Sequence, residues 1–213
     1  MLNKKILKEA DLYFITDRKL SKKTEIDDVK AAIKAGVKII QYREKELPTK
    51  EIYTKAKELR EITKKNNVLL IINDRVDIAL AVDADGIHLG LDDMPYDIAR
   101  KLLGNKIIGL TVHNFEEAIE AENLGADYVG ISPIFATTTK LDAGKPAGLE
   151  LIKKIKNKIN IPFVAIGGIN FENLDSVLKA GAKSVAAISS IVTKDDVEAE
   201  SKRFIEKIKR HCQ

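Results

Sequence analysis

Gln41, Arg43 and Lys45 are the first side chains along the chain whose types and spacing could do chemistry. They alternate along an extended segment, so all three project to one side while Tyr42 and Glu44 project to the other. Two cations and an amide on one side suit a polyphosphate, which needs both charge and directed donors. The alternative is a solvated edge with ordinary salt bridges. The position of the three residues at the end of an apolar run favours the binding role.

Asn73, Asp74 and Arg75 end a run that is otherwise wholly apolar, where packing gives no reason for an acid. Asp74 and Asp93 could hold a Mg²⁺ ion that bridges to substrate phosphate, since Mg²⁺ is usually held by one or two carboxylates with phosphate oxygens and water. Asp92 is adjacent to Asp93, and the sequence does not choose between them. Asp74 could instead stabilise the N-terminus of the helix that it precedes.

Two histidines lie near the ends of apolar runs. His88 is flanked by apolar residues, where a hydrogen-bonded core histidine is the more frequent outcome. His113 follows Thr111 in a better exposed segment before a helix, and it could act as a general acid or base. It could equally cap local backbone groups, and both interpretations stay open at this point.

Thr137, Thr139 and Lys140 supply hydroxyls and one ammonium in a segment that continues to Gly148. The segment is longer than most strand-to-helix turns and carries a cation, which favours a loop that covers substrate. The alternative is an ordinary solvated loop.

Gly167-Gly168 and Ser189-Ser190 follow two later apolar runs. Barrels often hold a phosphate at the corresponding strand ends on backbone N–H groups and a helix N-terminus. Together with the cationic and acidic residues, this pattern predicts a metal-assisted enzyme with two anion-binding subsites. Two phosphorylated substrates, or one bisphosphate, would satisfy it.

Eight apolar runs, each followed by a helical pattern, are expected to position these residues. The predicted strands are 12–15, 37–41, 68–72, 86–89, 107–110, a run within 125–133, 162–166 and 184–188. The predicted helices are 27–35, 49–65, 76–82, 95–103, 115–124, 148–158, 171–180 and 195–210, with Gly36 ending the first and Thr49 capping the second. Strands without polar alternation are typical of a covered parallel sheet.

The pattern favours an α/β fold of the single-domain (β/α)₈ TIM barrel type, because similar helix-to-strand turns introduce alternate strands and alternate strands supply alternate core layers. A doubly wound open sheet is the alternative, since glycine-capped turns are normal there too. In a barrel, all of the side chains named above would gather at the carboxyl ends of the strands.

Composition narrows the function classes. Residues 1–213 fit one domain, and hydrophobic residues at 45% suffice for a full core. The charges are interspersed, with a net charge of +4 and aromatic residues at 5%, which disfavours nucleic-acid binding. The only cysteine is Cys212, the amino-terminal segment is too charged for a signal peptide, and no run has the roughly 18 apolar residues of a membrane span. We therefore expect a cytoplasmic protein that does not enter a membrane; a homo-oligomer is compatible with the sequence.

These strand-end motifs, taken together and in order, closely resemble the thiamine-phosphate synthase family, also called thiamine-phosphate pyrophosphorylase. The resemblance covers nearly the whole chain. Its motifs include Gln41-x-Arg43-x-Lys45, Asn73-Asp74-Arg75, His88-Leu89-Gly90, Thr137-x-Thr139-Lys140 and Gly167-Gly168. Each motif is common by itself, and the set at barrel spacing is specific.

The resemblance implies a barrel that joins hydroxymethylpyrimidine diphosphate to hydroxyethylthiazole phosphate. The residues that would bind the pyrimidine diphosphate are Gln41, Arg43, Lys45, Asn73, Thr111 and Lys140. The thiazole phosphate would be held by Thr137, Thr139, Gly168, Ile188 and Ser189. Asp74 and Asp93 would ligate Mg²⁺, the cofactor implied. Those expected to act in catalysis are Arg43, Lys45, Lys140 and Thr111.

Two positions depart from the family pattern, which usually has Gln at Leu91 and Ser at Thr111. Neither touches the predicted metal or pyrophosphate residues, so activity is expected to be retained. A sister family, the thiazole tautomerases, offers an alternative in which His113 is the acid or base. A barrel that binds thiazole phosphate without catalysis is a third reading. Asp74, Asp93 and the Thr-x-Thr-Lys motif favour the synthase over both.

Overall fold

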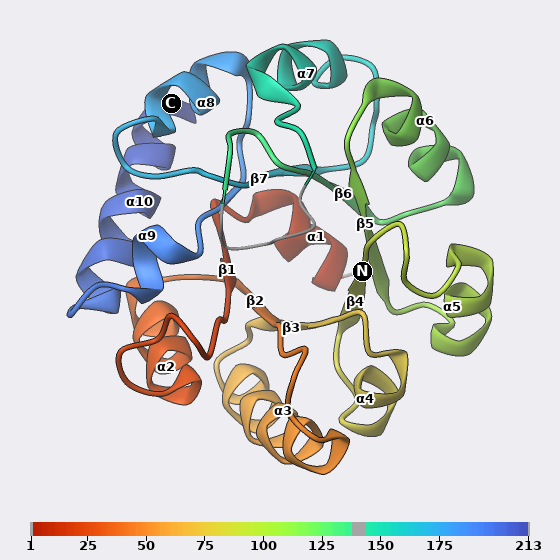
Figure 1. The fold of residues 1–213 in the computed structure, drawn as a ribbon, viewed down its shortest axis with the longest axis vertical. Coiled ribbons are helices and arrows are strands. Elements are labelled where there is room, and N and C mark those ends of the chain that lie inside the picture. The colour runs from red at the N-terminus through yellow and green to blue at the C-terminus, as the bar shows by residue number, and fades with distance from the viewer. Residues whose placement is uncertain (1, 138–143, 213) are drawn as a thin grey trace.

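Eight parallel strands close into a barrel in chain order, and the last strand pairs with the first (Figure 1). The computed structural model describes residues 2–137 and 144–212. The strands are β1 (Leu12–Ile15), β2 (Ile39–Tyr42), β3 (Leu69–Asn73), β4 (Gly86–Leu89), β5 (Ile107–Val112), β6 (Tyr128–Ile131), β7 (Phe163–Ile166) and β8 (Val185–Ala186). The predicted (β/α)₈ barrel is confirmed, and the open sheet is wrong.

Helices surround the barrel, and one of them lies across its middle in the view of Figure 1. They are α1 (Leu2–Glu9), α2 (Glu25–Ala35), α3 (Thr49–Lys65), α4 (Val76–Ala81), α5 (Tyr96–Leu103), α6 (Phe115–Leu124), α7 (Gly148–Ile155), α8 (Leu174–Ala180), α9 (Ser189–Val192) and α10 (Val197–Cys212). All eight predicted helices are present, with ends displaced by less than one turn. The first and the ninth were not predicted.

Side chains along the strands alternate between the barrel interior and the layer beneath the helices. Tyr13 and Ile39 belong to the inner apolar cluster, whereas their chain neighbours Phe14 and Ile40 belong to the outer one. Both faces of the sheet are therefore buried. This double burial explains why the strands read as continuous apolar runs.

The helix α1 lies across the middle of the barrel when the molecule is viewed along its shortest axis (Figure 1). Leu7, near the end of this helix, is buried in the inner cluster with Ile39, Leu69 and Ile107, each the first residue of its strand. Because these residues mark the amino ends of the strands, α1 covers that end of the barrel. The carboxyl ends are left for a site.

Glycines in the left-handed conformation end three of the helices. Gly36 follows α2 with φ 105°, as predicted, and Gly125 and Gly181 follow α6 and α8 with φ 94° and 119°. Only glycine adopts such angles without strain from a Cβ atom. These turns direct the chain back into β2, β6 and β8.

The prediction that Thr49 caps α3 is wrong. Pro48 occupies the cap position, and its carbonyl accepts hydrogen bonds from the backbone N–H groups of Glu51 and Ile52. The Thr49 hydroxyl instead accepts a hydrogen bond from Arg75 at 3.1 Å. The proline fixes a backbone angle suited to a helix entry, so no side-chain cap is needed.

The eighth strand is shorter than the predicted 184–188 and spans two residues. The carbonyl of Ile188 accepts hydrogen bonds from the N–H groups of Ile191 and Val192, so the chain turns into α9 at this point. Within the described part of the chain, no helix is long and apolar enough to cross a bilayer.

Candidate active site

A pocket of about 820 Å³ opens at the carboxyl ends of the strands. The predicted site residues that line it are Arg43, Lys45, Asn73, Asp93, Thr111, Thr137, Gly168, Ile188 and Ser189. They come from the ends of seven different strands, β2 to β8, as expected for a site at the carboxyl end of a barrel. Of the remaining candidates, Asp74 lies beside the lining residues, Gln41 is buried in the interior, and Thr139 and Lys140 lie outside the described residues.

The cationic side of the pocket is formed by Arg43 and Lys45, which follow β2. The predicted alternation is present, because Tyr42 is buried in the outer cluster and Glu44 is paired with Arg18 on the side away from the pocket. The Arg43 guanidinium lies 3.8 Å from the carboxylate of Asp17. Two positive charges therefore face one solvent-filled space, where they could bind an anion.

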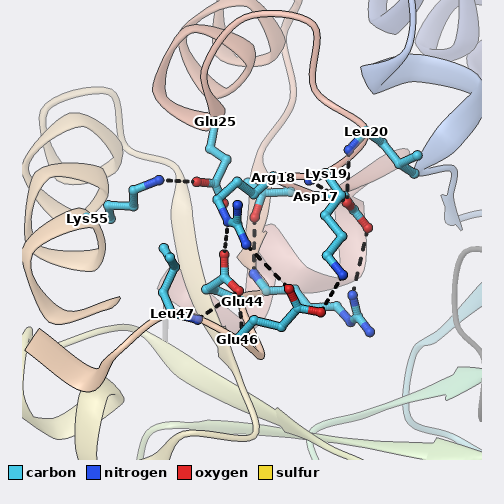
Figure 2. Close-up of polar contacts among 11 residues, drawn as sticks. Asp17, Arg18, Lys19, Leu20, Glu25, Glu44, Glu46, Leu47 and Lys55 are labelled. Carbon is cyan, nitrogen blue, oxygen red and sulfur yellow. Dashed lines mark hydrogen bonds and ion pairs between the residues drawn. The ribbon is translucent and has the colours of Figure 1, made fainter. Parts of the chain in front are cut away.

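An outer charge cluster, consisting of Arg18, Glu25, Glu44 and Lys55, supports this strand end (Figure 2). Arg18 donates to Glu44 at 2.7 Å, and Lys55 donates to the buried Glu25 at 2.7 Å. Glu44 also accepts a hydrogen bond from the backbone N–H of Glu46 at 2.8 Å. The contacts of Glu44 with Arg18 and with the backbone of Glu46 hold this side chain on the side away from the pocket, between Arg43 and Lys45 in the chain.

The pKa of Glu44 shows that its partners outweigh the cost of burying its charge. Burial alone would raise the pKa, but the backbone N–H of Glu46 and the Arg18 guanidinium outweigh it and hold the pKa below its usual value. The carboxylate is therefore stabilised in its charged form by the fold.

Asp74 is the acid at the end of β3, and its surroundings differ from those of Glu44. Its carboxylate accepts a hydrogen bond from Asn73 at 2.7 Å and lies 3.4 Å from the ammonium of Lys45. Burial raises the pKa of Asp74; Lys45 opposes this shift, and the negative charge of Asp93 adds to it. A buried carboxylate whose pKa is raised and which has a second carboxylate beside it forms a site where a cation would be stabilised.

Asp93 is the second acid, and the structure distinguishes it from its neighbour. Asp93 lines the pocket, and its carboxylate accepts a hydrogen bond from the backbone N–H of Gly90 at 2.6 Å. Asp92 is exposed and is not among the lining residues. The position of Asp93 in the pocket lining favours it over Asp92, and its role as a metal ligand stays a prediction.

The donor set fits a hard divalent cation. Asp74 and Asp93 supply carboxylate oxygens, and Asn73 supplies an amide oxygen nearby. No group of three or more His, Cys, Asp or Glu side chains that could hold a metal occurs in residues 2–137 and 144–212. This number of ligands suits Mg²⁺, which keeps several waters and takes further oxygens from substrate phosphate.

The opposite side of the pocket is made largely of backbone. Gly167 and Gly168 have φ angles of 98° and 64° and approach the segment after β6 closely. A Cβ atom on Gly168 would lie 2.6 Å from the carbonyl oxygen of Ala136, so no other residue fits. Ser189, the first residue of α9, lines the same side. A glycine turn and the start of a helix without an acidic residue beside them are features that suit a phosphate.

Gln41 and Thr111 lie deeper than the charged residues. Gln41 is buried and donates a hydrogen bond to Tyr13 at 3.0 Å, so it is not among the lining residues. Thr111 lines the floor of the pocket and lies 2.9 Å from Nε2 of His88. His88 is a buried and hydrogen-bonded histidine, as expected from the sequence. A substrate contact for Gln41 stays a prediction.

His113 lies away from this constellation. It is half-buried, and both its backbone N–H and its Nδ1 lie within hydrogen-bond distance of Glu117, at 2.7 and 3.2 Å. It is not among the residues that line the pocket. Of the two roles left open for His113, the local one fits its contacts. Leu91, the departure from the family pattern, is 65% exposed and also lies off the pocket.

Three residues near the site were not singled out from the sequence: Tyr13, Tyr128 and Ser132. Ser132 lines the pocket, and the two tyrosines meet beneath it with their hydroxyl oxygens 2.6 Å apart. A tyrosine hydroxyl within a buried strand is the sequence feature that marks the two tyrosines. Periodicity alone does not show which residues of a barrel interior lie near the pocket.

Comparison with known proteins agrees with this geometry. The sequence pattern of a family described as thiamine monophosphate synthase matches residues 12–191. The chain belongs to the thiamine monophosphate synthase family. This confirms the resemblance inferred from the strand-end motifs.

Other members of this family are similar over nearly their full lengths. A thiamine-phosphate synthase of Methanosarcina mazei is 54% identical over 209 residues, which is 98% of this chain and 87% of that protein. One from Chloroflexus aurantiacus is 49% identical over 194 residues, which is 91% of this chain and 90% of that protein. The solved structure of a thiamine phosphate pyrophosphorylase from Pyrococcus furiosus superposes with a TM-score of 0.87 and 43% identity, covering 95% of this chain and 98% of the other.

Proposed function

We propose that the protein is a Mg²⁺-dependent thiamine-phosphate synthase. It joins hydroxymethylpyrimidine diphosphate to hydroxyethylthiazole phosphate and releases thiamine monophosphate and pyrophosphate. The observation that carries this proposal is one pocket with two unlike anion-binding sides. Arg43, Lys45 and the two carboxylates lie on one side, and the turn at Gly168 with Ser189 lies on the other. Membership of the family supports the same reaction.

The first half of the reaction takes place on the charged side. The bond between the pyrimidinylmethyl carbon and the diphosphate oxygen breaks, and the oxygen keeps the electron pair. Arg43 and Lys45 neutralise the charge that develops on this leaving group. Lys140, which lies outside the described residues, is proposed to add a third cation. Asp74 and Asp93 would hold Mg²⁺, which when bound supplies further charge neutralisation to the diphosphate oxygens.

The second half depends on positioning. The electron-rich aminopyrimidine stabilises the carbocation-like carbon that remains, and the thiazole nitrogen donates its lone pair to that carbon. Thr137, Thr139, Gly168, Ile188 and Ser189 are proposed to hold the thiazole phosphate. No protein nucleophile takes part in this scheme. Correct placement of the two reactants accounts for much of the rate, because it replaces an encounter in solution.

Neither alternative function gains support from the described residues. The tautomerase mechanism needs His113 at the substrate, and His113 is bonded to Glu117 outside the pocket lining. A barrel that only binds thiazole phosphate would not need the carboxylate pair with its raised proton affinity at Asp74.

The test is pyrophosphate release by purified protein with both substrates and Mg²⁺. Release should require both substrates and the metal, should be accompanied by thiamine monophosphate, and should be lost in Asp74→Ala. Asp92→Ala is the matched control, because Asp92 is an exposed carboxylate in the same loop as Asp93 and should leave the rate unchanged. No release from folded protein that binds thiazole phosphate would overturn the proposal.

A further inference from the structure

A continuous series of hydrogen bonds crosses the barrel interior beneath the pocket. Gln41 Nε2 donates to Tyr13 Oη at 3.0 Å, and Tyr13 Oη lies 2.6 Å from Tyr128 Oη. Tyr128 Oη lies 3.0 Å from His88 Nδ1, and His88 Nε2 lies 2.9 Å from Thr111 Oγ1. We call these five residues the interior relay. All five are buried, and only its last members, His88 and Thr111, line the pocket.

Two glycines make room for the rings of the interior relay. A Cβ atom on Gly109 would lie 2.1 Å from the ring of Tyr128, and one on Gly130 would lie 3.1 Å from the ring of His88. The rings of Tyr128 and His88 are also in contact, with centroids 5.5 Å apart. Larger residues at either glycine would displace the rings, so the relay is part of how this barrel interior is packed.

The relay has a direction because each hydroxyl has one hydrogen. Burial raises the pKa of both Tyr13 and Tyr128, so both phenols stay protonated. Tyr13 accepts from Gln41, so its own buried hydrogen is satisfied within the relay only if Tyr13 donates to Tyr128. In that arrangement the Tyr128 hydrogen is in turn satisfied by Nδ1 of His88. A neutral imidazole that accepts at Nδ1 carries its hydrogen on Nε2.

The direction reaches the pocket at Thr111. Because His88 donates from Nε2, the Thr111 oxygen accepts, and the hydrogen of its own hydroxyl is left for a partner elsewhere. Thr111 lines the pocket, where a bound molecule is that partner. With donor and acceptor exchanged in every hydrogen bond, Thr111 would donate to His88, and its oxygen could only accept a hydrogen bond from a molecule in the pocket.

We propose that Tyr13, Tyr128 and His88 are positioning residues that fix the Thr111 hydroxyl as a hydrogen-bond donor to an acceptor nitrogen of the bound pyrimidine. This assignment rests on the proposed function for the identity of the ligand. The direction of the relay does not, since it is a property of the protein alone. A donor to a ring that gains positive charge does not favour the transition state, so the contribution is to binding of the substrate.

The first experiment reads the direction without any substrate. Long-range ¹H–¹⁵N NMR of protein labelled at histidine reports which imidazole nitrogen carries the hydrogen, and a His88→Gln variant assigns the signal among the three histidines. We expect the Nε2–H form in the native chain. The Nδ1–H form would overturn the proposal.

A second variant reverses the relay. Gln41→Glu replaces an amide that donates with a carboxylate that only accepts, so Tyr13 must donate to it and every later bond changes direction. Burial raises the pKa of a carboxyl group at this position, so we expect His88 to change to the Nδ1–H form only above the pH at which the introduced carboxyl group is ionised. An unchanged tautomer there would contradict the proposal.

The kinetic experiment separates positioning from general structural damage. Tyr128→Phe should raise KM for the pyrimidine diphosphate about tenfold, with kcat changed much less, which corresponds to one hydrogen bond. In a Thr111→Val background the same change should add no further loss, because the relay acts through Thr111. Additive losses would overturn the proposal.

Tyr42→Phe is the matched control. Tyr42 is a fully buried phenol in β2, and among the described residues its hydroxyl has no hydrogen-bond partner. The change should alter neither KM nor the His88 tautomer. Absence of synthase activity in the unsubstituted, folded protein would contradict the proposed function. The NMR experiment would still decide the direction of the relay.

Discussion

Two acids lie on opposite sides of the segment that follows β2, and folding shifts their pKa values in opposite directions. Glu44 points away from the pocket, pairs with Arg18 at 2.7 Å and has a lowered pKa. Asp74 lies on the pocket side, 3.4 Å from Lys45, and has a raised pKa, to which burial contributes most and Asp93 also contributes. Both acids have a cation as partner, so pairing alone does not explain the difference.

The difference lies in what else surrounds each carboxylate. Glu44 accepts backbone hydrogen bonds in addition to its ion pair, which compensates for its burial. Asp74 is buried and lies near the negative charge of Asp93, and the neighbouring cations Lys45 and Arg43 compensate its charge only in part. Folding has thus compensated the charge of Glu44 and left that of Asp74 to be compensated by a cation. Such incomplete compensation is frequent at functional sites.

Of the variants proposed here, Asp74→Asn should have the largest effect, because it removes the charge of the acid on the pocket side. The substitution keeps the shape, and asparagine tolerates the φ of 51° at this position, but the charge is lost. We expect kcat for pyrophosphate release to fall about 10²- to 10³-fold, the range for loss of one group that stabilises developing charge. A Mg²⁺ titration at saturating substrates measures it. A loss of less than about tenfold would contradict a metal role.

Lys45→Met and Lys55→Met form a matched pair, since their side chains are 41% and 36% exposed. Lys45→Met should raise KM for the pyrimidine diphosphate about 10- to 100-fold, as expected for loss of a charge-assisted hydrogen bond. Lys55→Met should leave KM unchanged and lower the free energy of unfolding, because buried Glu25 loses its partner. Steady-state kinetics and urea denaturation compare the two, and equal effects on KM would remove the distinction between the two sides.

Glu44→Gln should lower the free energy of unfolding by about 1–3 kcal/mol at neutral pH. The pKa of Glu44 is lowered by folding, so its contribution is present above the pKa of the unfolded chain. That contribution is lost as pH falls through the folded pKa, and the two proteins should converge there. Urea denaturation over a pH series checks this, and a difference that does not depend on pH would point to packing instead.

Asp74→Asn should change stability less than Lys55→Met or Glu44→Gln, and it should raise stability where those two lower it. Because the pKa of Asp74 is raised by folding, its charged form destabilises the native state at neutral pH. The variant should therefore have a higher Tm without Mg²⁺, and the gain should fade as pH falls through the raised pKa toward the unfolded value. Thermal unfolding in a chelator measures it; a lower Tm at neutral pH would show that Lys45 fully compensates the charge.

Much of the fold could be predicted because each strand and helix carries its own pattern. The apolar runs and amphipathic segments gave all eight strands and eight of the ten helices within the described chain. The exception at the amino end, α1, is a charged segment whose burial of Leu7 depends on a barrel end to cover. Likewise, Thr49 has a residue type that favours caps, but the preceding proline took that position.

The candidate site could be predicted in part. The alternation at Arg43, Glu44 and Lys45 follows from the geometry of any extended segment, and the structure keeps it. Residue type alone did not distinguish Asp93 from Asp92, because both have the same chemistry; the family resemblance pointed to Asp93, which lines the pocket. His113 has a suitable side chain for catalysis, and its place beside Glu117 follows from the start of α6.

The sequence by itself determined the order of the elements, the parallel barrel and the set of charged and glycine residues at the strand ends, because those depend on local periodicity and residue type. Only the tertiary structure decided which of these residues meet. Strand register and barrel closure bring Gln41, Tyr13, Tyr128, His88 and Thr111 into one series of hydrogen bonds, although some are separated by more than a hundred residues. Proximity and desolvation, which set the pKa of Asp74 and the direction of that series, arise only when distant segments pack together.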